Sequence, residues 1–413
     1  MVALAVVVVV SLVIVGRAKP APAPTIWEEQ PIIIGHVHPF TGGFSMFGTA
    51  CATGIDVAID EINLSGGVLG RPLKVINRDS RLSPEVGLRE AKDLVLTQHV
   101  DFLMGNISST VAAAISDFAK GQKCIYIITG SRDTPLTEEK GHRYVFRIGA
   151  NTYSRVFTVA SLAAEQWPGA KKVVMLNPDY EYGYECGRDF MEVYGKLVPG
   201  AELIYSDFPP LGTGDYTPYI TKLMASDAEI LFHAFYGGDY LTFTKQAVPA
   251  GVYDRLHVVG ASCGGTETVC SMTKDNPAPI GEILSDEFPY WEIEYPEAKR
   301  VASLFMEKQA VSFGSYEACL GYTTVYAMKE AIEAAGAVDT EKIIDYLEGA
   351  EIDSPIGKVK IRAIDHQAMW PPYAGTMAFT TDYTWPHITN IWYPEPIESS
   401  YHTPEYIEAV RSR

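Results

Sequence analysis

The sequence contains few basic side chains for its length. Of its 413 residues, 33 are lysine or arginine and 51 are aspartate or glutamate, which gives a formal net charge of −18. No run of basic residues interrupts this pattern. Because nucleic acids and anionic lipids are negatively charged, so acidic a surface repels both. We therefore expect no nucleic-acid partner.

Short motifs that mark common enzymes are also missing. The chain has no glycine-rich dinucleotide fingerprint, no phosphate-binding loop, no His-Glu-x-x-His and no Gly-x-Ser-x-Gly. Its nine histidines are scattered. His36 and His38 would share one face of a strand, but no third metal ligand is evident in the sequence. We therefore expect a protein that is not an enzyme, with no cofactor and no metal.

The six cysteines form no Cys-x-x-Cys pair, which argues against zinc and thioredoxin-like sites. Cys263 and Cys270 are close enough to form a disulfide if the protein is exported, and free thiols at both positions are the alternative. The other four fall in expected helices or buried strands, where a free thiol packs as a small hydrophobe. These four are Cys51, Cys124, Cys186 and Cys319.

The N-terminal segment begins with an apolar run over residues 2–15, which is too short for a comfortable bilayer span. Small residues and prolines follow, so residues 1–24 are predicted to be a signal peptide. Arg17 and Lys19 come after the run and not before it, so a retained N-terminal anchor is the alternative. Either interpretation places the protein in the periplasm or outside the cell.

From residue 31 onward, short β-branched runs alternate with helical patterns. A strand at 32–37 opens a first unit that continues to 128, and the pattern restarts with a helix at 153–166. The segments from 282 to 393 are too few for a third domain, so we expect them to complete the two earlier sheets. The sequence therefore predicts an α/β protein with two Rossmann-like lobes, joined by several crossings, and a ligand cleft between them.

Several segments resemble a known family. They are Pro31-Ile32-Ile33-Ile34-Gly35, Pro39-Phe40-Thr41-Gly42, Ala58-Ile59-Asp60-Glu61-Ile62-Asn63, Gly66-Gly67-Val68-Leu69-Gly70-Arg71-Pro72-Leu73 and Tyr236-Gly237-Gly238-Asp239. Together they resemble type I periplasmic binding proteins, in particular the branched-chain amino-acid-binding family of ATP-driven importers. The resemblance extends from about 32 to 393. It implies two lobes, three hinge crossings, closure on a ligand and docking to a membrane permease.

The resemblance also implies a division of the chain. The first lobe is expected to comprise residues 31–150 and about 275–352, and the second lobe residues 151–270 and about 355–395. Residues 396–413 then form a C-terminal tail. Asp365-His366-Gln367 falls where the last crossing enters the second lobe, and we expect a hydrogen-bond cluster there instead of a catalytic dyad.

The first-lobe side of the expected cleft begins with Phe47, which resembles an aromatic pocket residue of the family. Ser108, Ser109 and Thr110 follow a predicted strand and bring hydroxyls and backbone N–H groups together at a helix N-terminus. Such an arrangement attracts an anion such as a carboxylate. An ordinary N-cap is the alternative.

Ser131, Arg132 and Asp133 follow the next strand. They lie in a loop that resembles the one contacting the ligand's carboxylate and amino groups. The family more often has small residues and a threonine there, so the two charged side chains are a departure. Either they pair with each other, or they bind a ligand that carries its own charges.

Two tyrosines are expected on the second-lobe side. Tyr182 and Tyr236 resemble positions that close over the ligand in the family. Their rings offer a large contact area and a hydroxyl at small entropic cost, which suits a closing clamp.

The largest departure follows the predicted strand at 257–259. Amino-acid binders of the family have a glutamate there for the α-ammonium group, whereas this chain has Ala261-Ser262-Cys263-Gly264-Gly265. Burying an ammonium group without a carboxylate is costly. Either Asp133 or Glu317 replaces the missing charge, or the ligand has no α-amino group. We favour the second hypothesis, with Ser262 at the site.

The sequence therefore predicts an ABC-transporter substrate-binding protein. It would capture an amino acid, carboxylate or amide by lobe closure and deliver it to a membrane permease, as a monomer or weak dimer. A ligand-sensing domain of a signalling system, of the amide-sensor or receptor-ectodomain type, is the alternative.

Overall fold

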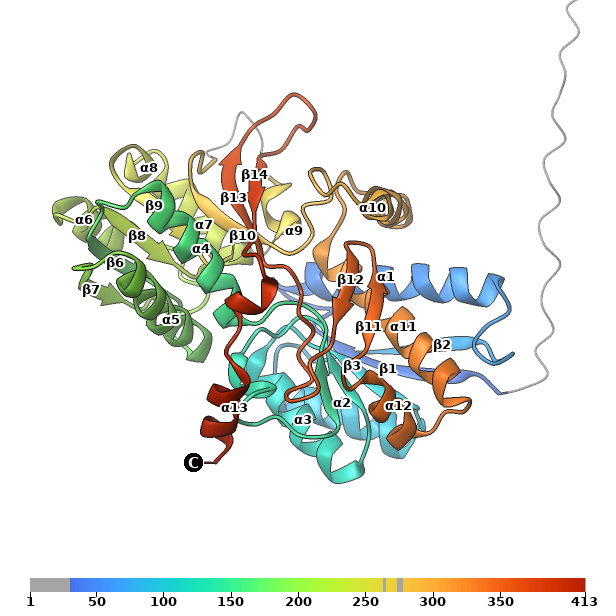
Figure 1. Cartoon of the computed structure of the whole chain (residues 1–413). Coiled ribbons are helices and arrows are strands. Elements are labelled where there is room, and N and C mark those ends of the chain that lie inside the picture. Colours follow the sequence, from blue (N-terminus) through green and yellow to red (C-terminus); the bar gives the residue numbers. More distant parts are fainter. Residues whose placement is uncertain (1–29, 263–264, 273–277, 413) are drawn as a thin grey trace, which may run out of the picture.

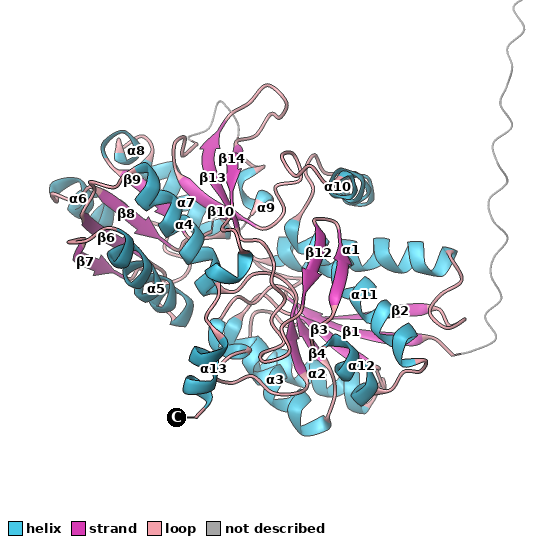
Figure 2. Ribbon diagram, in the orientation of Figure 1, coloured by secondary structure: helices cyan, strands magenta, loops and turns pink. Residues whose placement is uncertain are grey.

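A computed structural model describes residues 30–262, 265–272 and 278–412. The predicted leader at 1–24 and Cys263, half of the candidate disulfide, lie outside the described residues. The described chain folds into two α/β lobes, each built on its own sheet with helices on both faces (Figures 1 and 2). Within this part of the chain, no helix combines the length and apolar character that crossing a membrane requires.

The first lobe has five parallel strands in the order β2-β1-β3-β4-β5. The strands are β1 (Ile32–His38), β2 (Leu73–Asp79), β3 (Phe102–Gly105), β4 (Tyr126–Ile128) and β5 (Val145–Arg147). The helices are α1 (Ser45–Leu64), α2 (Pro84–Leu96), α3 (Ser109–Gln122), α10 (Pro296–Gln309), α11 (Tyr316–Ala335) and α12 (Thr340–Leu347). Alternate side chains of β1 enter opposite cores: Ile32 and Ile34 pack with α1 and α11, whereas Val37 packs with α2 and α3.

The second lobe has seven strands in the order β14-β13-β10-β9-β8-β6-β7. The strands are β6 (Lys172–Leu176), β7 (Glu202–Asp207), β8 (Ile230–His233), β9 (His257–Gly260), β10 (Ile283–Asp286), β13 (Tyr373–Ala378) and β14 (His387–Trp392). The helices are α4 (Thr152–Gln166), α5 (Glu181–Leu197), α6 (Thr217–Ala225), α7 (Gly237–Ala247), α8 (Val252–Arg255) and α9 (Thr266–Val269). Strand β13 runs antiparallel to both of its neighbours, β10 and β14, whereas the other neighbouring strands of this sheet are parallel.

The chain passes between the sheets after β5, after β10 and after the hairpin of β11 (Glu351–Ser354) and β12 (Gly357–Lys360). Two expected lobe limits need correction. Strand β10 pairs with β9 and β13, so the return to the first lobe follows Asp286 and not about residue 275. The side chains of Ile352 and Val359 in the hairpin enter the first-lobe core, so the last crossing follows Lys360 and not about residue 355.

Backbone and side-chain hydrogen bonds join the first and third crossings. The N–H of Arg147 donates to the carbonyl of His366 at 3.1 Å, and Nε2 of Gln367 donates to the carbonyl of Gly149 at 2.7 Å. Residues 365–367 therefore form the hydrogen-bond cluster that the sequence predicts.

The C-terminal segment returns from the second sheet to the first lobe. After β14 come a short turn, η2 (Ile397–Ser400), and helix α13 (Pro404–Arg411). The guanidinium of Arg411 donates to the carbonyls of Thr137 and Glu138 in the first lobe, at 2.9 and 2.7 Å. Figure 1 shows α13 beside that lobe. The segment predicted to be a tail is thus a fourth link between the lobes.

Helices α1 and α11 pack unusually close together because two glycines lie in their interface. A Cβ atom at Gly54 would lie 1.8 Å from the carbonyl oxygen of Ala318, and one at Gly321 would lie 2.5 Å from that of Cys51. Only glycine fits at such a distance. The contact brings the first turn of α11 against α1, below the carboxyl end of β1.

Candidate functional site

A cavity lies between the two lobes, at the carboxyl ends of the parallel strands. The loops after β3 and β4 and the first turn of α11 form its first-lobe wall, and α4 with the segments after β6, β8 and β9 forms the other. It leaves about 380 Å³ free of protein atoms, its open mouth included. Its lining residues are Ile107, Ser109, Gly130, Arg132, Arg155, Tyr180, Tyr182, Tyr236, Ser262 and Tyr316. This is where open α/β sheets bind ligands.

Two arginines, one from each lobe, carry the charge of this cavity. Oε1 of Glu287 lies 2.8 Å from Nε of Arg132 and 3.6 Å from Nε of Arg155, so both guanidinium groups share one carboxylate. Arg132 also donates from Nη1 to the carbonyl of Thr129 at 2.7 Å. Its Nη2 has no hydrogen-bond partner within the described part of the chain. A buried donor without a partner is rare in folded proteins.

Glu287, which pairs with both arginines, is also hydrogen-bonded to the chain crossings. Its Oε2 accepts a hydrogen bond from the N–H of Ala150 in the first crossing, at 3.1 Å. Its carbonyl accepts one from Nε1 of Trp370 in the third crossing, at 2.9 Å. Because Glu287 itself lies in the second crossing, all three segments meet at this residue, directly behind the two arginines.

Among the described residues, no carboxylate side chain lines the cavity, although acids lie behind it. Glu317 is fully buried, with Oε1 3.8 Å from Nη2 of Arg132, and burial raises its pKa to about 7. Burial also raises the pKa of Asp286 to about 6. The charged side chains that line the cavity are thus Arg132 and Arg155, whereas the carboxylates lie behind them, so the groups presented to a ligand favour an anion.

Aromatic rings cover the remaining wall. The hydroxyls of Tyr180 and Tyr236 lie 2.9 Å apart within hydrogen-bond distance, and the ring of Tyr182 meets Tyr236 edge to face at 5.8 Å. Phe44 of the first lobe lies 5.4 Å from Tyr236, centroid to centroid. Opposite them, the guanidinium of Arg132 lies 5.5 Å from the ring centroid of Tyr316. The cavity therefore offers planar apolar surface beside its two cations.

The structure brings five of the residues predicted from the sequence into the lining of this cavity. They are Ser109, Arg132, Tyr182, Tyr236 and Ser262. Three come from the second lobe and two from the first.

Six predicted residues do not line it: Phe47, Ser108, Thr110, Ser131, Asp133 and Glu317. Some of them support lining residues from behind. Phe47 is fully buried beneath Phe44. Ser131 donates to the hydroxyl of Ser109 at 3.3 Å, and Glu317 lies beside Arg132.

The other positions have structural roles of their own. The hydroxyl of Ser108 accepts from the N–H of Val111, as an ordinary N-cap does, and Thr110 is exposed next to it. Asp133 is buried beside Glu185 of the second lobe, and burial raises its pKa.

Sequence reasoning missed Arg155, Tyr180 and Tyr316 as lining residues. Arg155 lies in the first turns of α4, a helix whose pattern indicates only packing. Tyr180 lies two residues before Tyr182 and Tyr316 lies directly before Glu317, so the signal was one or two residues away. Only the packing of the lobes shows which neighbour faces the cavity.

Comparisons with known proteins agree with this geometry. A family model described as periplasmic binding protein matches residues 31–380. The Leu/Ile/Val-binding protein homolog 4 of Brucella abortus (strain 2308) is 23% identical over 360 residues, which cover 83% of each chain.

Solved structures give the same fold. A solute-binding protein of an ABC transporter from Rhodopseudomonas palustris, in complex with 4-hydroxybenzoate, superposes with a TM-score of 0.79 at 19% identity, covering 90% of this chain and 99% of that one. A leucine-binding protein from Thermotoga maritima superposes with a TM-score of 0.73 at 20% identity, covering 88% and 99%. With the family model matched over most of its length, the chain belongs to the type I periplasmic binding proteins, in the branched-chain amino-acid-binding family.

Proposed function

We propose that this protein binds a small aromatic carboxylate without an α-ammonium group, closes its lobes on it and delivers it to an ABC permease. As a member of a solute-binding family it serves in transport and is not an enzyme. The proposal places it in the periplasm or outside the cell, where such a receptor meets both its solute and the permease.

The charge of the cavity carries this proposal. Arg132 and Arg155 face the cavity, and its lining contains no carboxylate side chain from the part of the chain that the structure describes. An α-ammonium group would then lie among cations, without the carboxylate that its burial requires. The carboxylate of a solute, in contrast, gains charge-assisted hydrogen bonds from guanidinium groups.

Neither acid considered as a replacement for the missing glutamate reaches the cavity. Asp133 lies beside Glu185, and Glu317 is covered by Arg132. The geometry therefore favours the hypothesis that the solute lacks an α-amino group.

The tyrosines favour an aromatic solute. Tyr180, Tyr182 and Tyr236 offer faces and edges for a flat ring, and the hydroxyls of Tyr180 and Tyr236 add polar groups to the same wall. The relative solved with 4-hydroxybenzoate shows that this fold accommodates such a molecule. Because another relative is a leucine-binding protein, amino acids are the class of solute to compare with aromatic carboxylates.

Isothermal titration calorimetry tests the proposal directly. The chain, unfolded and refolded to remove any retained solute, is titrated with benzoate, 4-hydroxybenzoate, benzamide and leucine. We expect the two acids to bind and benzamide and leucine not to bind. Binding of leucine with no response to either acid would overturn the proposal.

A pair of arginine variants shows whether the cavity is the site. Arg155→Gln should weaken binding of the acids roughly ten- to a hundred-fold, the value of losing a hydrogen bond to a charged group. The matched control is Arg89→Gln on helix α2, whose side chain is 66% exposed and distant from the cavity. Equal affinities in the two variants would place the site elsewhere.

A further inference from the structure

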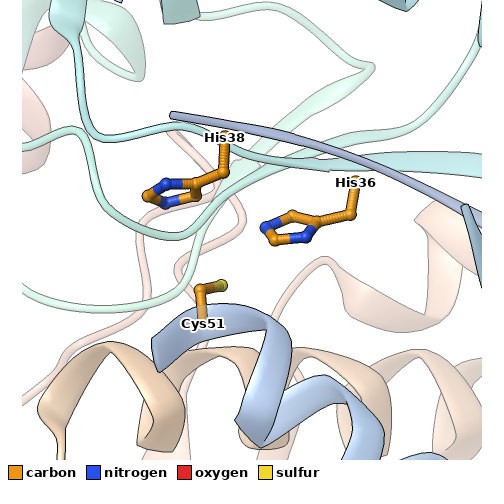
Figure 3. Close-up of side chains that lie close together, drawn as sticks. All are labelled: His36, His38 and Cys51. Carbon is orange, nitrogen blue, oxygen red and sulfur yellow. The ribbon is translucent and has the colours of Figure 1, made fainter. Parts of the chain in front are cut away.

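Two histidines and a cysteine meet in the interior of the first lobe, outside the solute cavity. His36 and His38 lie on β1 and Cys51 on α1, and all three side chains are fully buried. Their potential metal-binding atoms all lie within 4.8 Å of one another. Figure 3 shows the two imidazole rings on one side of the strand, with the thiol reaching toward them from the helix below.

The polar atoms of this cluster are largely without partners. Within the described part of the chain, Nε2 of His36 and both ring nitrogens of His38 have no hydrogen bond. The thiol of Cys51 has only a long contact, 3.7 Å, to the hydroxyl of Thr129. Since nearly all buried polar atoms in folded proteins are hydrogen-bonded, three unpartnered nitrogens in one place indicate a missing group.

One hydrogen bond sets the orientation of the first imidazole. Nδ1 of His36 lies 2.8 Å from Oδ1 of Asn77, an oxygen that only accepts hydrogen bonds. Nδ1 therefore carries the proton, and the lone pair of Nε2 is directed into the cluster. Metal-binding histidines are held by a second partner in this way.

A fourth donor lies at the edge of the cluster. Oε2 of Glu317 is 3.9 Å from Nε2 of His38, and neither of its carboxylate oxygens has a hydrogen bond within the described residues. The close packing of α1 and α11 at Gly54 and Gly321 brings Glu317 to this position.

We propose that His36, His38, Cys51 and Glu317 form a binding site for one zinc ion. Two imidazoles, one thiolate and one carboxylate are the donors that Zn²⁺ accepts, in a tetrahedral arrangement. The two negative ligands balance the charge of the ion, so the buried site is neutral overall. Bond lengths of about 2.0–2.3 Å place tetrahedral donors about 3–4 Å apart. The imidazoles and the thiol, now within 4.8 Å of one another, would therefore close by about 1 Å, and Glu317 would complete the set from the edge of the cluster.

This site is distinct from the solute cavity. None of the four residues lines that cavity, and the ion would lie one layer behind Arg132. From the sequence, only the two histidines on one strand face were evident, because the third ligand comes from a helix 13 residues after His38, with no spacing typical of a zinc motif.

Cobalt provides the first test, because a Co²⁺ ion bound to a thiolate has a charge-transfer absorption in the near ultraviolet. The intact chain is purified under reducing conditions, stripped with a chelator and titrated with Co²⁺ and then Zn²⁺. We expect the band to saturate at one ion per chain and Zn²⁺ to abolish it. A wild-type chain that develops no thiolate band would overturn the proposal without any variant.

Two cysteine variants locate the ion. Cys51→Ser should remove the cobalt band and weaken zinc binding at least ten-fold. Cys124→Ser is the matched control, a buried thiol of the same lobe outside the cluster, and should keep both. Circular dichroism shows whether each variant is folded. If folded Cys51→Ser retains the band and the affinity of Cys124→Ser, the ion binds elsewhere and the proposal fails.

Discussion

Oε1 of Glu287 lies 2.8 Å from Nε of Arg132, and this ion pair links the second chain crossing to the wall of the solute cavity. Both side chains are almost completely buried, at 1% and 5% exposure. A buried charge that loses its partner is strongly destabilising, because no water replaces the lost interaction. Glu287 is therefore important both for the hinge and for the charge of the cavity.

Glu287→Gln should lower the free energy of unfolding by about 3 kcal/mol, since it leaves Arg132 and Arg155 buried without their shared carboxylate. Urea denaturation measures this value. If the cavity binds carboxylates, benzoate should stabilise the variant more than the wild type, because it supplies the missing charge. Glu192→Gln, on the surface of α5, is the control and should change stability by less than about 0.5 kcal/mol. Equal losses in the two variants would contradict the role given to Glu287.

Phe44→Ala should weaken solute binding while leaving each lobe folded. Phe44 belongs to the first lobe and contacts Tyr236 of the second, so its ring stabilises the closed form. An aromatic pair contributes about 0.5–1.5 kcal/mol, which corresponds to a two- to ten-fold loss of affinity. Calorimetry with the acid that binds the wild type measures the loss. Phe44→Leu keeps part of the apolar contact, so its affinity should lie between those of the wild type and Phe44→Ala. An unchanged affinity in Phe44→Ala would show that the contact does not serve closure.

Asp189→Asn should stabilise the protein at neutral pH more than at acidic pH. Burial raises the pKa of Asp189 from 3.8 to about 6, despite its ion pair with Arg188. Between these values the folded state binds more protons than the unfolded state, so this residue's contribution to stability falls as pH rises from about 4 to about 6. The asparagine cannot ionise and avoids that loss. The unfolding free energies of Asp189→Asn and the wild type are measured at pH 4 and at pH 7.5. The variant's advantage over the wild type should be larger at pH 7.5, by about 1–3 kcal/mol. A difference independent of pH would show that the pKa of Asp189 is not raised.

Gly54→Ala should destabilise the first lobe by about 1–3 kcal/mol or more. The added Cβ would lie 1.8 Å from the carbonyl oxygen of Ala318, and backbone atoms can yield only if α1 and α11 separate. Gly121→Ala, in helix α3 with open space around it, should instead stabilise slightly, because alanine is the better helix former. Chemical denaturation of both variants is the measurement, and similar effects would contradict the close approach of the two helices.

The fold was largely predictable because regular patterns determine it. Buried parallel strands such as Ile32–His38 begin with β-branched runs, and helices such as Glu181–Leu197 carry clear apolar stripes. Strand β5 was missed because its short apolar run ends in Arg147, and β11 because its polar side chains alternate with buried ones. Expected free, buried thiols at Cys51, Cys124, Cys186 and Cys319 are confirmed.

The site was only partly predictable, for a geometric reason. Strand ends indicate which loops reach the cavity, as for the loop of Arg132, whereas Tyr182 was expected from the resemblance to the family. Which side of each loop faces inward depends on lobe packing, so Glu317 was expected in the cavity and its neighbour Tyr316 is there instead. Arg155 comes from a helix with no motif, and only the assembled lobes show it.

The return of α13 to the first lobe has a mechanical consequence. Three neighbouring crossings act together like a strip hinge, which permits both bending and twisting. The bonds from Arg411 to the carbonyls of Thr137 and Glu138 add a fourth link beside that strip, because Arg411 also donates to the carbonyl of Ile364 in the third crossing. A fourth link beside the other three widens the strip, and a wider strip resists twisting more than bending. The lobes of this protein should therefore open along one principal direction, so that the solute enters and leaves through one side of the molecule.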